Sequence, residues 1–269
     1  MRDDPIALQL PWLKPAIERM PDKPVVLRIT GLTKWFGDVC VLDGIDLEMR
    51  EGEVLGLIGP GGVGKTVLVK ICCGLLEPDA GEIEILGQIL SELKEKQRQL
   101  LRERVGLVFQ NYALFDFMTV GENVAFPMRQ RGGSSPEEIA AKVQERLSEV
   151  DLPKVGNLMP NELSGGMKKR VGLARANIND PELIFFDDPT AGLDPVTSSK
   201  IFHLIRKTQS HRNSTCLVIS HDIDRMRPAC DRYILLYEGK VHFSGNEGEA
   251  MRATDPIVCE FFRRDEGKK

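Results

Sequence analysis

The sequence has no stretch that could cross a membrane as a helix, because no apolar run approaches the about 20 residues that a bilayer requires. Its first residues, Met1-Arg2-Asp3-Asp4-Pro5, lack the basic region and apolar segment of a secretory signal. We therefore expect a soluble, cytosolic chain, and any role at a membrane would depend on a partner.

Signals for disulfides and for nucleic-acid binding are also missing. The cysteines show no Cys-x-x-Cys spacing, and several lie inside apolar runs, as reduced core thiols do. The net charge is −4, so bulk electrostatics predict no nucleic-acid partner. The sequence shows no internal repeat and no low-complexity tract.

The length and pattern favour an α/β protein. A chain of 269 residues that is 42% hydrophobic suits one large domain with a subdomain, or two small domains. Residues 1–24 are punctuated by prolines and form an N-terminal extension. Strands alternate with helices through 25–244, which predicts a mostly parallel sheet. About 111–165 is a helical insertion, and 245–269 is a helical tail with a basic end.

Local patterns give the expected elements. Residues 111–128 are predicted to be rich in loops and aromatics, and Trp35-Phe36-Gly37-Asp38 a turn. Ser135 and Glu138 predict a capped helix that runs to about Val150. Strands are expected at 25–29, 41–49, 54–58, 82–87, 105–109, 183–186, 215–219, 233–237 and 241–243. Other helices are expected at 67–71, 90–103 and 196–212, and directly after Gly166.

One stretch organises the rest: Gly59-Pro60-Gly61-Gly62-Val63-Gly64-Lys65-Thr66, the phosphate-binding pattern of Gly, four residues and Gly-Lys-Ser/Thr. An apolar strand enters it and an apolar helix leaves it, as the motif requires. Glycines let the backbone N–H groups approach phosphate oxygens. Lys65 supplies charge for the β- and γ-phosphates, and the Thr66 hydroxyl suits Mg²⁺. The alternative is a plain glycine turn between a strand and a helix.

Three further sites carry candidate chemistry. The strand 183–186 leads into Asp187, which can hold Mg²⁺ through water, and Asp188, which can orient an attacking water. The alternative is a strand that merely ends at the surface.

Ser164-Gly165-Gly166 opens a helix and forms an anion-binding N-terminus, or Ser164 is only an N-cap. His221 follows a strand and could reach a γ-phosphate, although a lone His is more often structural. Lys168, Lys169, Arg170 and Arg175 are expected on polar positions of the helix after Gly166.

The order of these motifs resembles an ATP-binding-cassette (ABC) ATPase over about residues 25–244. The order is the phosphate loop, Gln110, Leu-Ser-Gly-Gly at 163–166, Asp187-Asp188, Ala-Gly-Leu-Asp at 191–194 and His221. The resemblance implies a RecA-like P-loop NTPase core, a small N-terminal antiparallel β subdomain and an inserted α-helical subdomain.

Members of this family pair head to tail around two ATP molecules, so the resemblance also implies site roles. Gly59–Thr66 and Val67 would hold the phosphates, and Phe36, with Trp35 as the alternative, would stack on adenine. Thr66, Asp187 and Gln110 would contact Mg²⁺; catalysis would use Lys65, Gln110, Asp188 and His221. Ser164, Gly165 and Gly166 would cap the other subunit's γ-phosphate, and Asp194 would lie at the seam.

The sequence departs from the family pattern at three positions. Asp188 stands where the catalytic Glu is usual, so its carboxylate is one methylene shorter and hydrolysis is expected to be slow. Val67 stands where a second Ser/Thr often contacts the α-phosphate. Gly61 stands where a Ser is common.

Met-Lys-Lys-Arg at 167–170 and the segment 255–262 resemble the ATPases of Mce-type lipid transporters. That branch implies a homodimer on the cytoplasmic face of the inner membrane, with an integral-membrane permease docked near 111–128. The docking socket there would be formed by aromatic residues; alternatively, Phe115, Phe117 and Phe126 are only core of the insertion. Both interpretations predict burial, so only a complex distinguishes them. An Mce-domain lipid-binding protein and a small regulatory subunit would be further partners. The alternatives are an importer of a small solute such as an amino acid, a nucleotide-gated ABC protein outside transport, and a binding module that scarcely hydrolyses ATP.

Overall fold

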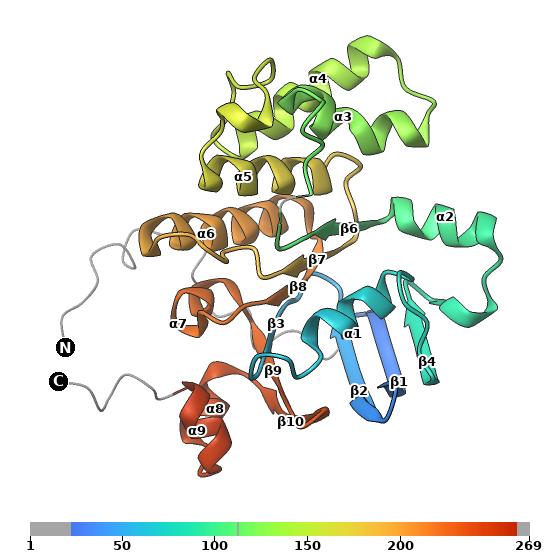
Figure 1. Ribbon diagram of the computed structural model, residues 1–269, viewed down its shortest axis with the longest axis vertical. Coiled ribbons are helices and arrows are strands. Elements are labelled where there is room, and N and C mark those ends of the chain that lie inside the picture. Colours follow the sequence, from blue (N-terminus) through green and yellow to red (C-terminus); the bar gives the residue numbers. More distant parts are fainter. Residues whose placement is uncertain (1–22, 112, 263–269) are drawn as a thin grey trace.

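The strands form two sheets that share one apolar interior. The computed structural model describes residues 23–111 and 113–262, so most of the N-terminal extension and the basic end of the tail lie outside the described residues. One sheet has six strands in the order β10-β9-β3-β8-β7-β6, and the other has four in the order β2-β1-β4-β5. Figure 1 shows the three helices α3, α4 and α5 gathered at one end of the molecule.

The six-stranded sheet is parallel except for its last strand. Its parallel members are β3 (Val54–Ile58), β6 (Val105–Val108), β7 (Leu183–Asp187), β8 (Thr215–Ile219) and β9 (Arg232–Tyr237). Every residue of β3, β7 and β8 is buried, because both faces of the sheet are covered. β10 (Lys240–Gly245) pairs antiparallel with β9. The predicted parallel core is confirmed.

The smaller sheet is antiparallel, as the resemblance implied. It contains β1 (Val25–Phe36), β2 (Val39–Arg50), β4 (Ala80–Ile85) and β5 (Gln88–Ile89). The first helix, α1 (Lys65–Cys72), buries Leu68 and Ile71 in the core that this sheet shares with β3. The predicted turn at residues 35–38 was wrong in extent: Trp35 and Phe36 end β1, and only Gly37 and Asp38 turn.

The chain between β6 and β7 forms α3 (Val120–Arg131), α4 (Pro136–Glu149) and α5 (Gly165–Ala176). The Ser135–Glu138 cap of α4 is confirmed. The loop prediction for 111–128 was wrong from Val120 onward, because Thr119 and Glu122 form a capping box that opens α3. Pro127 lies within this helix and hid the helical pattern.

Other helices connect and cover the sheets. They are α2 (Glu95–Glu103), α6 (Pro195–Arg212), α7 (Ile223–Met226), α8 (Glu247–Arg252) and α9 (Pro256–Phe262), with 3-10 turns at Leu90–Glu92, Pro160–Glu162 and Arg227–Ala229. Val258 and Phe262 of α9 are buried, and the Phe262 ring packs on Tyr233 of β9. Among the described residues, no helix is long and apolar enough to span a bilayer.

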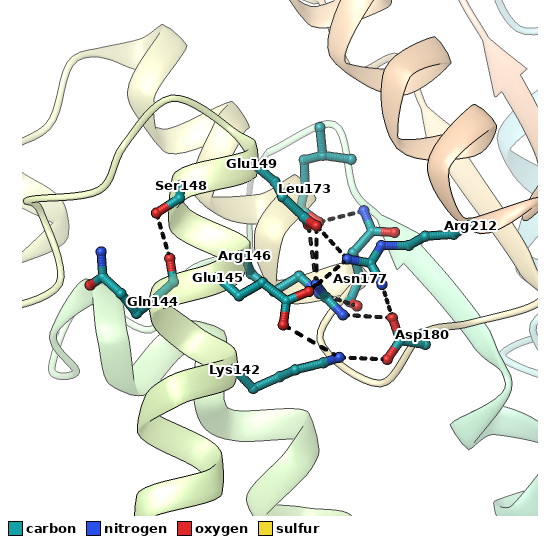
Figure 2. A network of polar contacts seen from close by, with 10 residues as sticks. All are labelled: Lys142, Gln144, Glu145, Arg146, Ser148, Glu149, Leu173, Asn177, Asp180 and Arg212. Atoms are coloured by element: carbon teal, nitrogen blue, oxygen red, sulfur yellow. Dashed lines mark hydrogen bonds and ion pairs between the residues drawn. The ribbon is translucent and has the colours of Figure 1, made fainter.

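A polar network centred on the buried Arg146 joins α4 to the segment after α5 and to the end of α6 (Figure 2). Arg146 of α4 has no exposed surface; its Nε lies 2.9 Å from the Asn177 carbonyl oxygen and its Nη2 lies 2.5 Å from Asp180 Oδ1. Arg212, at the end of α6, pairs with Asp180 and with Glu149 of α4. We call the set Lys142, Glu145, Arg146, Glu149, Asn177, Asp180 and Arg212 the Arg146 network.

Candidate functional site

The phosphate loop lies between β3 and α1, where its glycines are sterically required at two positions. Gly59 has φ 146°, and a Cβ there would lie 2.2 Å from the Leu236 carbonyl oxygen. Gly64 has φ 105°, and its Cβ would lie 2.8 Å from Leu42 Cδ2. A Cβ at Gly61 would meet nothing within 4 Å, so the Gly in place of the usual Ser reflects no lack of space. Val67 is partly buried against the apolar core.

Lys65 is buried and points back at the loop. Its Nζ donates to the carbonyl oxygens of Gly59 and Pro60, each at 2.8 Å. Burial lowers the pKa of Lys65, and the nearby carboxylates of Asp188 and Asp187 oppose that shift. The ammonium group is thus held by two neutral acceptors, which the oxygens of a phosphate could replace.

Thr66 and Asp187 bring two hard oxygen ligands together. The Thr66 hydroxyl, at the start of α1, donates to Asp187 Oδ1 at the end of β7 over 2.9 Å. Mg²⁺ prefers oxygen ligands and usually takes one or two from protein, with phosphate and water completing its shell. This donor set fits Mg²⁺, which Thr66 and Asp187 would hold. Gln110 has an exposed side chain beyond the end of β6.

Asp188 occupies an unusual backbone position beside this pair. Its φ of 46° is left-handed, its N–H donates to the Ile219 carbonyl, and its own carbonyl accepts from Ala191 N–H. Burial raises the pKa of the Asp188 carboxyl, although His221, Lys169 and Lys65 pull it downward. A raised pKa makes a carboxylate a better proton acceptor near neutral pH. His221 Nε2 lies 3.9 Å from Asp188 Oδ2, on a side chain that is 56% exposed.

Ser164, Gly165 and Gly166 lie at the start of α5, whereas the phosphate loop lies at the start of α1. Ser164 Oγ accepts the Met167 N–H at 3.3 Å and caps α5, so the N-cap interpretation is correct as geometry. Asp194 caps α6 through the N–H groups of Val196 and Thr197 and accepts the Thr197 hydroxyl at 2.6 Å. These hydrogen bonds, led by the Thr197 hydroxyl, lower the pKa of Asp194.

The two helix N-termini pack against each other. A Cβ at Gly166 would lie 2.7 Å from Thr197 Cγ2, so a residue without a side chain suits this contact. α5 packs against α3, α4, β6 and α6, whereas α1 contacts β7. The chain therefore carries two separate sets of candidate residues, one on the phosphate loop and one on α5 and α6.

Phe36 and Trp35 lie half-exposed at the end of β1. Lys34 Nζ is 5.6 Å from the centre of the Phe36 ring, and the Trp35 N–H donates to Asp79. The following strand places Leu42 against Gly64 of the phosphate loop. An exposed aromatic pair is a suitable platform for a flat base.

The prediction that Lys169 lies on a polar position of α5 is wrong. It is 2% exposed, and its Nζ lies 2.6 Å from the Gln110 carbonyl oxygen and 3.4 Å from that of Asp188. Burial lowers its pKa, against the opposing charges of Asp188 and Asp187. Helical spacing carried the signal, because Lys169 lies four residues before Leu173, on the buried face of α5.

The aromatic cluster near α3 is only partly buried. The Phe115 ring packs on Phe126 with centroids 4.8 Å apart and on Phe117 at 5.6 Å. Phe115 and Phe126 are half-buried. Phe117 is 77% exposed, so it is not part of the core of the insertion; its ring is open to a partner, and its burial against a permease stays a prediction.

A phosphate loop at the end of a parallel strand, with an acid at the end of a second strand, defines the class of P-loop ATPases. A family model described as "ABC transporter" matches residues 42–191. The chain belongs to the ABC transporter family, and it is an ATP-binding-cassette ATPase that uses ATP and Mg²⁺.

Three known proteins are similar to most of the chain. Protein TRIGALACTOSYLDIACYLGLYCEROL 3, chloroplastic, of Arabidopsis thaliana is 40% identical over 89% of this chain and 74% of its own. The intermembrane phospholipid transport system ATP-binding protein MlaF of Haemophilus influenzae is 35% identical over 88% and 90%. A dimeric post-hydrolysis structure of the ATP-binding cassette MJ0796 with ADP and Pi is 33% identical, covering 82% of this chain and 98% of that one, with a TM-score of 0.75.

Proposed function

We propose that the chain is the ATP-hydrolysing subunit of a phospholipid transporter of the Mce type, peripheral on the cytoplasmic face of a membrane. The observation that carries the proposal is its similarity, over nearly all of both chains, to a relative named for intermembrane phospholipid transport. A second relative is named after a galactolipid. The residues Met167-Lys168-Lys169-Arg170 and the segment 255–262 support the same branch.

ATP would bind along the phosphate loop. The backbone N–H groups of Gly59, Gly61–Thr66 and Val67 would surround the phosphates; Pro60 has no N–H and belongs to the loop without donating. Lys65 would exchange the Gly59 and Pro60 carbonyls for phosphate oxygens. Phe36 would stack on adenine. Thr66 and Asp187 would hold Mg²⁺, together with a Gln110 contact; the ion neutralises charge on the β- and γ-phosphates when it is bound.

Hydrolysis would take place between Gln110 and Asp188. The two residues would orient a water whose oxygen attacks the γ-phosphorus, while its proton passes to the Asp188 carboxylate. The bond from the γ-phosphorus to the bridging oxygen breaks, and ADP and phosphate are released. His221, 3.9 Å from Asp188 and largely exposed, would contact the γ-phosphate.

A second copy would complete each site. Ser164, Gly165 and Gly166 cap the far end of the nucleotide in this arrangement, and Asp194 lies at the seam. The packing of α5 on α6 through Gly166 and Thr197 supports a shared surface of this kind, and the cassette MJ0796 is dimeric. Binding of two ATP molecules would close the dimer, and release of phosphate would open it.

The permease would dock beside α3. Phe117 offers an exposed ring next to the half-buried Phe115 and Phe126. Arg175 Nη1 lies 2.6 Å from the Ala113 carbonyl oxygen, which ties this segment to α5. A movement of α5 would thereby be transmitted through this segment to the permease. An Mce-domain protein and a small regulatory subunit would complete the assembly.

The alternative function is import of a small solute. A relative 38% identical over 216 residues is named a methionine import ATP-binding protein, and the site residues are compatible with either cargo, because the cargo contacts the permease. A nucleotide-gated protein outside transport is a third possibility, and Asp188 is the residue that would favour slow hydrolysis.

The test is gentle affinity purification of the full chain from its native membranes, followed by mass spectrometry of bound proteins and lipids. We expect a permease, an Mce-domain protein and phospholipid. A solute permease with a binding protein would overturn the lipid assignment and retain the ATPase. Ribosomal or DNA-binding partners without a permease would overturn the transport function.

A further inference from the structure

Helix α5 holds backbone carbonyls of two neighbouring loops. Lys169, in its second turn, reaches the Gln110 carbonyl at 2.6 Å and the Asp188 carbonyl at 3.4 Å. Arg175, in its last turn, reaches the Ala113 carbonyl at 2.6 Å. With 12 residues the helix is about 18 Å long, so one rigid element spans Ser164 at its start and all of these contacts.

The Lys169 contacts join segments that are remote in sequence. Gln110 is 59 residues away along the chain and follows β6, and Asp188 is 19 residues away and follows β7. Lys169 is 2% exposed. A buried ammonium group must keep hydrogen-bond acceptors, since losing them would leave its charge uncompensated. The lysine therefore cannot release these carbonyls without finding others.

The two residues that Lys169 contacts need such support. Asp188 has a left-handed backbone at φ 46°, a conformation that persists only when neighbouring groups enforce it. Its N–H bonds to Ile219 and its carbonyl to Ala191, so Lys169 adds a further link from α5. Gln110 begins the segment that leads to α3. Further along this segment, Arg175 donates to the Ala113 carbonyl, and the Asn123 side chain bonds to the N–H and the carbonyl of Phe115.

We propose that Lys169 is a positioning residue for ATP hydrolysis, which fixes the backbone of Gln110 and of Asp188 to α5. The inference rests on the ATPase part of the proposed function and not on the lipid. Ser164, at the start of α5, would face the nucleotide of the other copy. Lys169 then transmits a displacement of α5 to both residues that handle the attacking water in its own site.

The test compares Lys169→Met with Lys169→Arg in the full-length chain. Methionine keeps the apolar stem and removes the donor, whereas arginine restores a donor. We expect kcat for ATP to fall about 10- to 100-fold in Lys169→Met, because a shift of about 1 Å in a catalytic group costs about that much. The Kd for a fluorescent ATP analogue should stay within about twofold, and Lys169→Arg should recover most of kcat.

The matched control is Lys168→Met, the neighbouring lysine on the less buried side of α5. It should leave kcat within about twofold of the wild type. If Lys169→Met behaves like this control, the proposal is overturned. A loss of kcat and of nucleotide affinity together, without recovery in Lys169→Arg, would also overturn it and indicate a purely structural role.

Lys169→Gln provides a second neutral variant in case the methionine variant does not fold, because its shorter side chain has no charge but keeps N–H donors. We expect a kcat between those of Lys169→Met and the wild type, with an unchanged Kd. Wild-type kcat in Lys169→Gln would contradict the need for the ammonium group of Lys169. Failure of the lipid assignment is measured separately, by what co-purifies with the wild-type chain, so the two results are independent.

Discussion

Two buried side chains, Arg146 and Lys65, carry positive charges that the protein stabilises in different ways. In the Arg146 network, a fully buried guanidinium is paired with carboxylates of Glu145, Glu149 and Asp180. In the nucleotide site, the Lys65 ammonium is held by two backbone carbonyls. The charge of Arg146 is therefore balanced by carboxylates of the same chain. Lys65 has only uncharged carbonyl acceptors, which the oxygens of a phosphate could replace.

This difference predicts that the Arg146 network contributes mainly to stability and Lys65 mainly to ligand binding. Removing one partner from a buried ion network leaves the others unpaired and costs stability. Removing a cation held only by carbonyls should cost little stability but take away the charge that we propose binds phosphate. The following substitutions separate these two consequences, beginning with the largest effect.

Lys65→Ala should abolish ATP turnover, with a loss of at least about 10³-fold, because no other side chain supplies charge inside the phosphate loop. The melting temperature without nucleotide should change by only a few degrees. Steady-state ATPase assays and thermal unfolding measure the two quantities. Lys70→Ala, on the exposed side of α1, is the control; turnover near the wild-type value in Lys65→Ala would remove Lys65 from the mechanism.

Arg146→Met should give the reverse result. It removes the donor of the Asn177 carbonyl, whereas Asp180 and Glu149 keep Arg212, so the free energy of unfolding should fall by about 1–3 kcal/mol. Nucleotide affinity of the folded protein should be preserved. Denaturant titration measures the loss, with the exposed Lys154→Met in the same subdomain as control. A loss below about 1 kcal/mol would mean that the network does not hold α4.

Asp188→Glu tests the site without touching the network. Glutamate extends the carboxylate by one methylene toward the attacking water, so kcat should rise by about tenfold if the short side chain limits hydrolysis. The free energy of unfolding should change by less than about 1 kcal/mol. Unchanged or lower turnover would overturn the idea that the short side chain of Asp188 limits hydrolysis.

The smallest effect concerns pH and Glu145. Burial alone would raise the pKa of this carboxyl, but Arg146, Arg212 and Lys142 outweigh burial, so its pKa in the folded protein lies below the usual 4.5. Folding therefore favours the ionised form. The stabilisation is present above pH 4.5 and is lost as the pH falls from there through the folded pKa.

Glu145→Gln should accordingly lower the free energy of unfolding by about 1 kcal/mol or less at pH 7, since the side chain is 49% exposed and solvent screens it. The difference from the wild type should stay constant between pH 7 and about 5.5 and shrink as the pH falls below 4.5. Denaturant titrations at several pH values measure it, and Glu82→Gln on β4 gives the background effect of losing one exposed carboxylate. A difference that grows on acidification would contradict the assigned direction.

Much of the fold was predictable because the relevant signals are local. The strand 54–58, the glycine loop and the helix behind it lie within one short stretch, and Asp187 follows directly on a buried strand. The cap of α4 was predictable from Ser135 and Glu138 alone. Helix α3 was missed because Pro127 and the aromatics around it suggested loop, whereas its start depends on a side-chain cap at Thr119.

The sequence by itself determined the elements, the phosphate loop and the acids that follow it, since hydrogen bonding and sterics between near neighbours decide them. Only the tertiary structure decided the contacts of Lys169, the exposure of Phe117 and the Arg146 network. Lys169 meets Gln110 across 59 residues, and Arg146 meets Asp180 across 34. No local pattern specifies such pairs, because each requires separate elements to pack before its buried charge can find a partner.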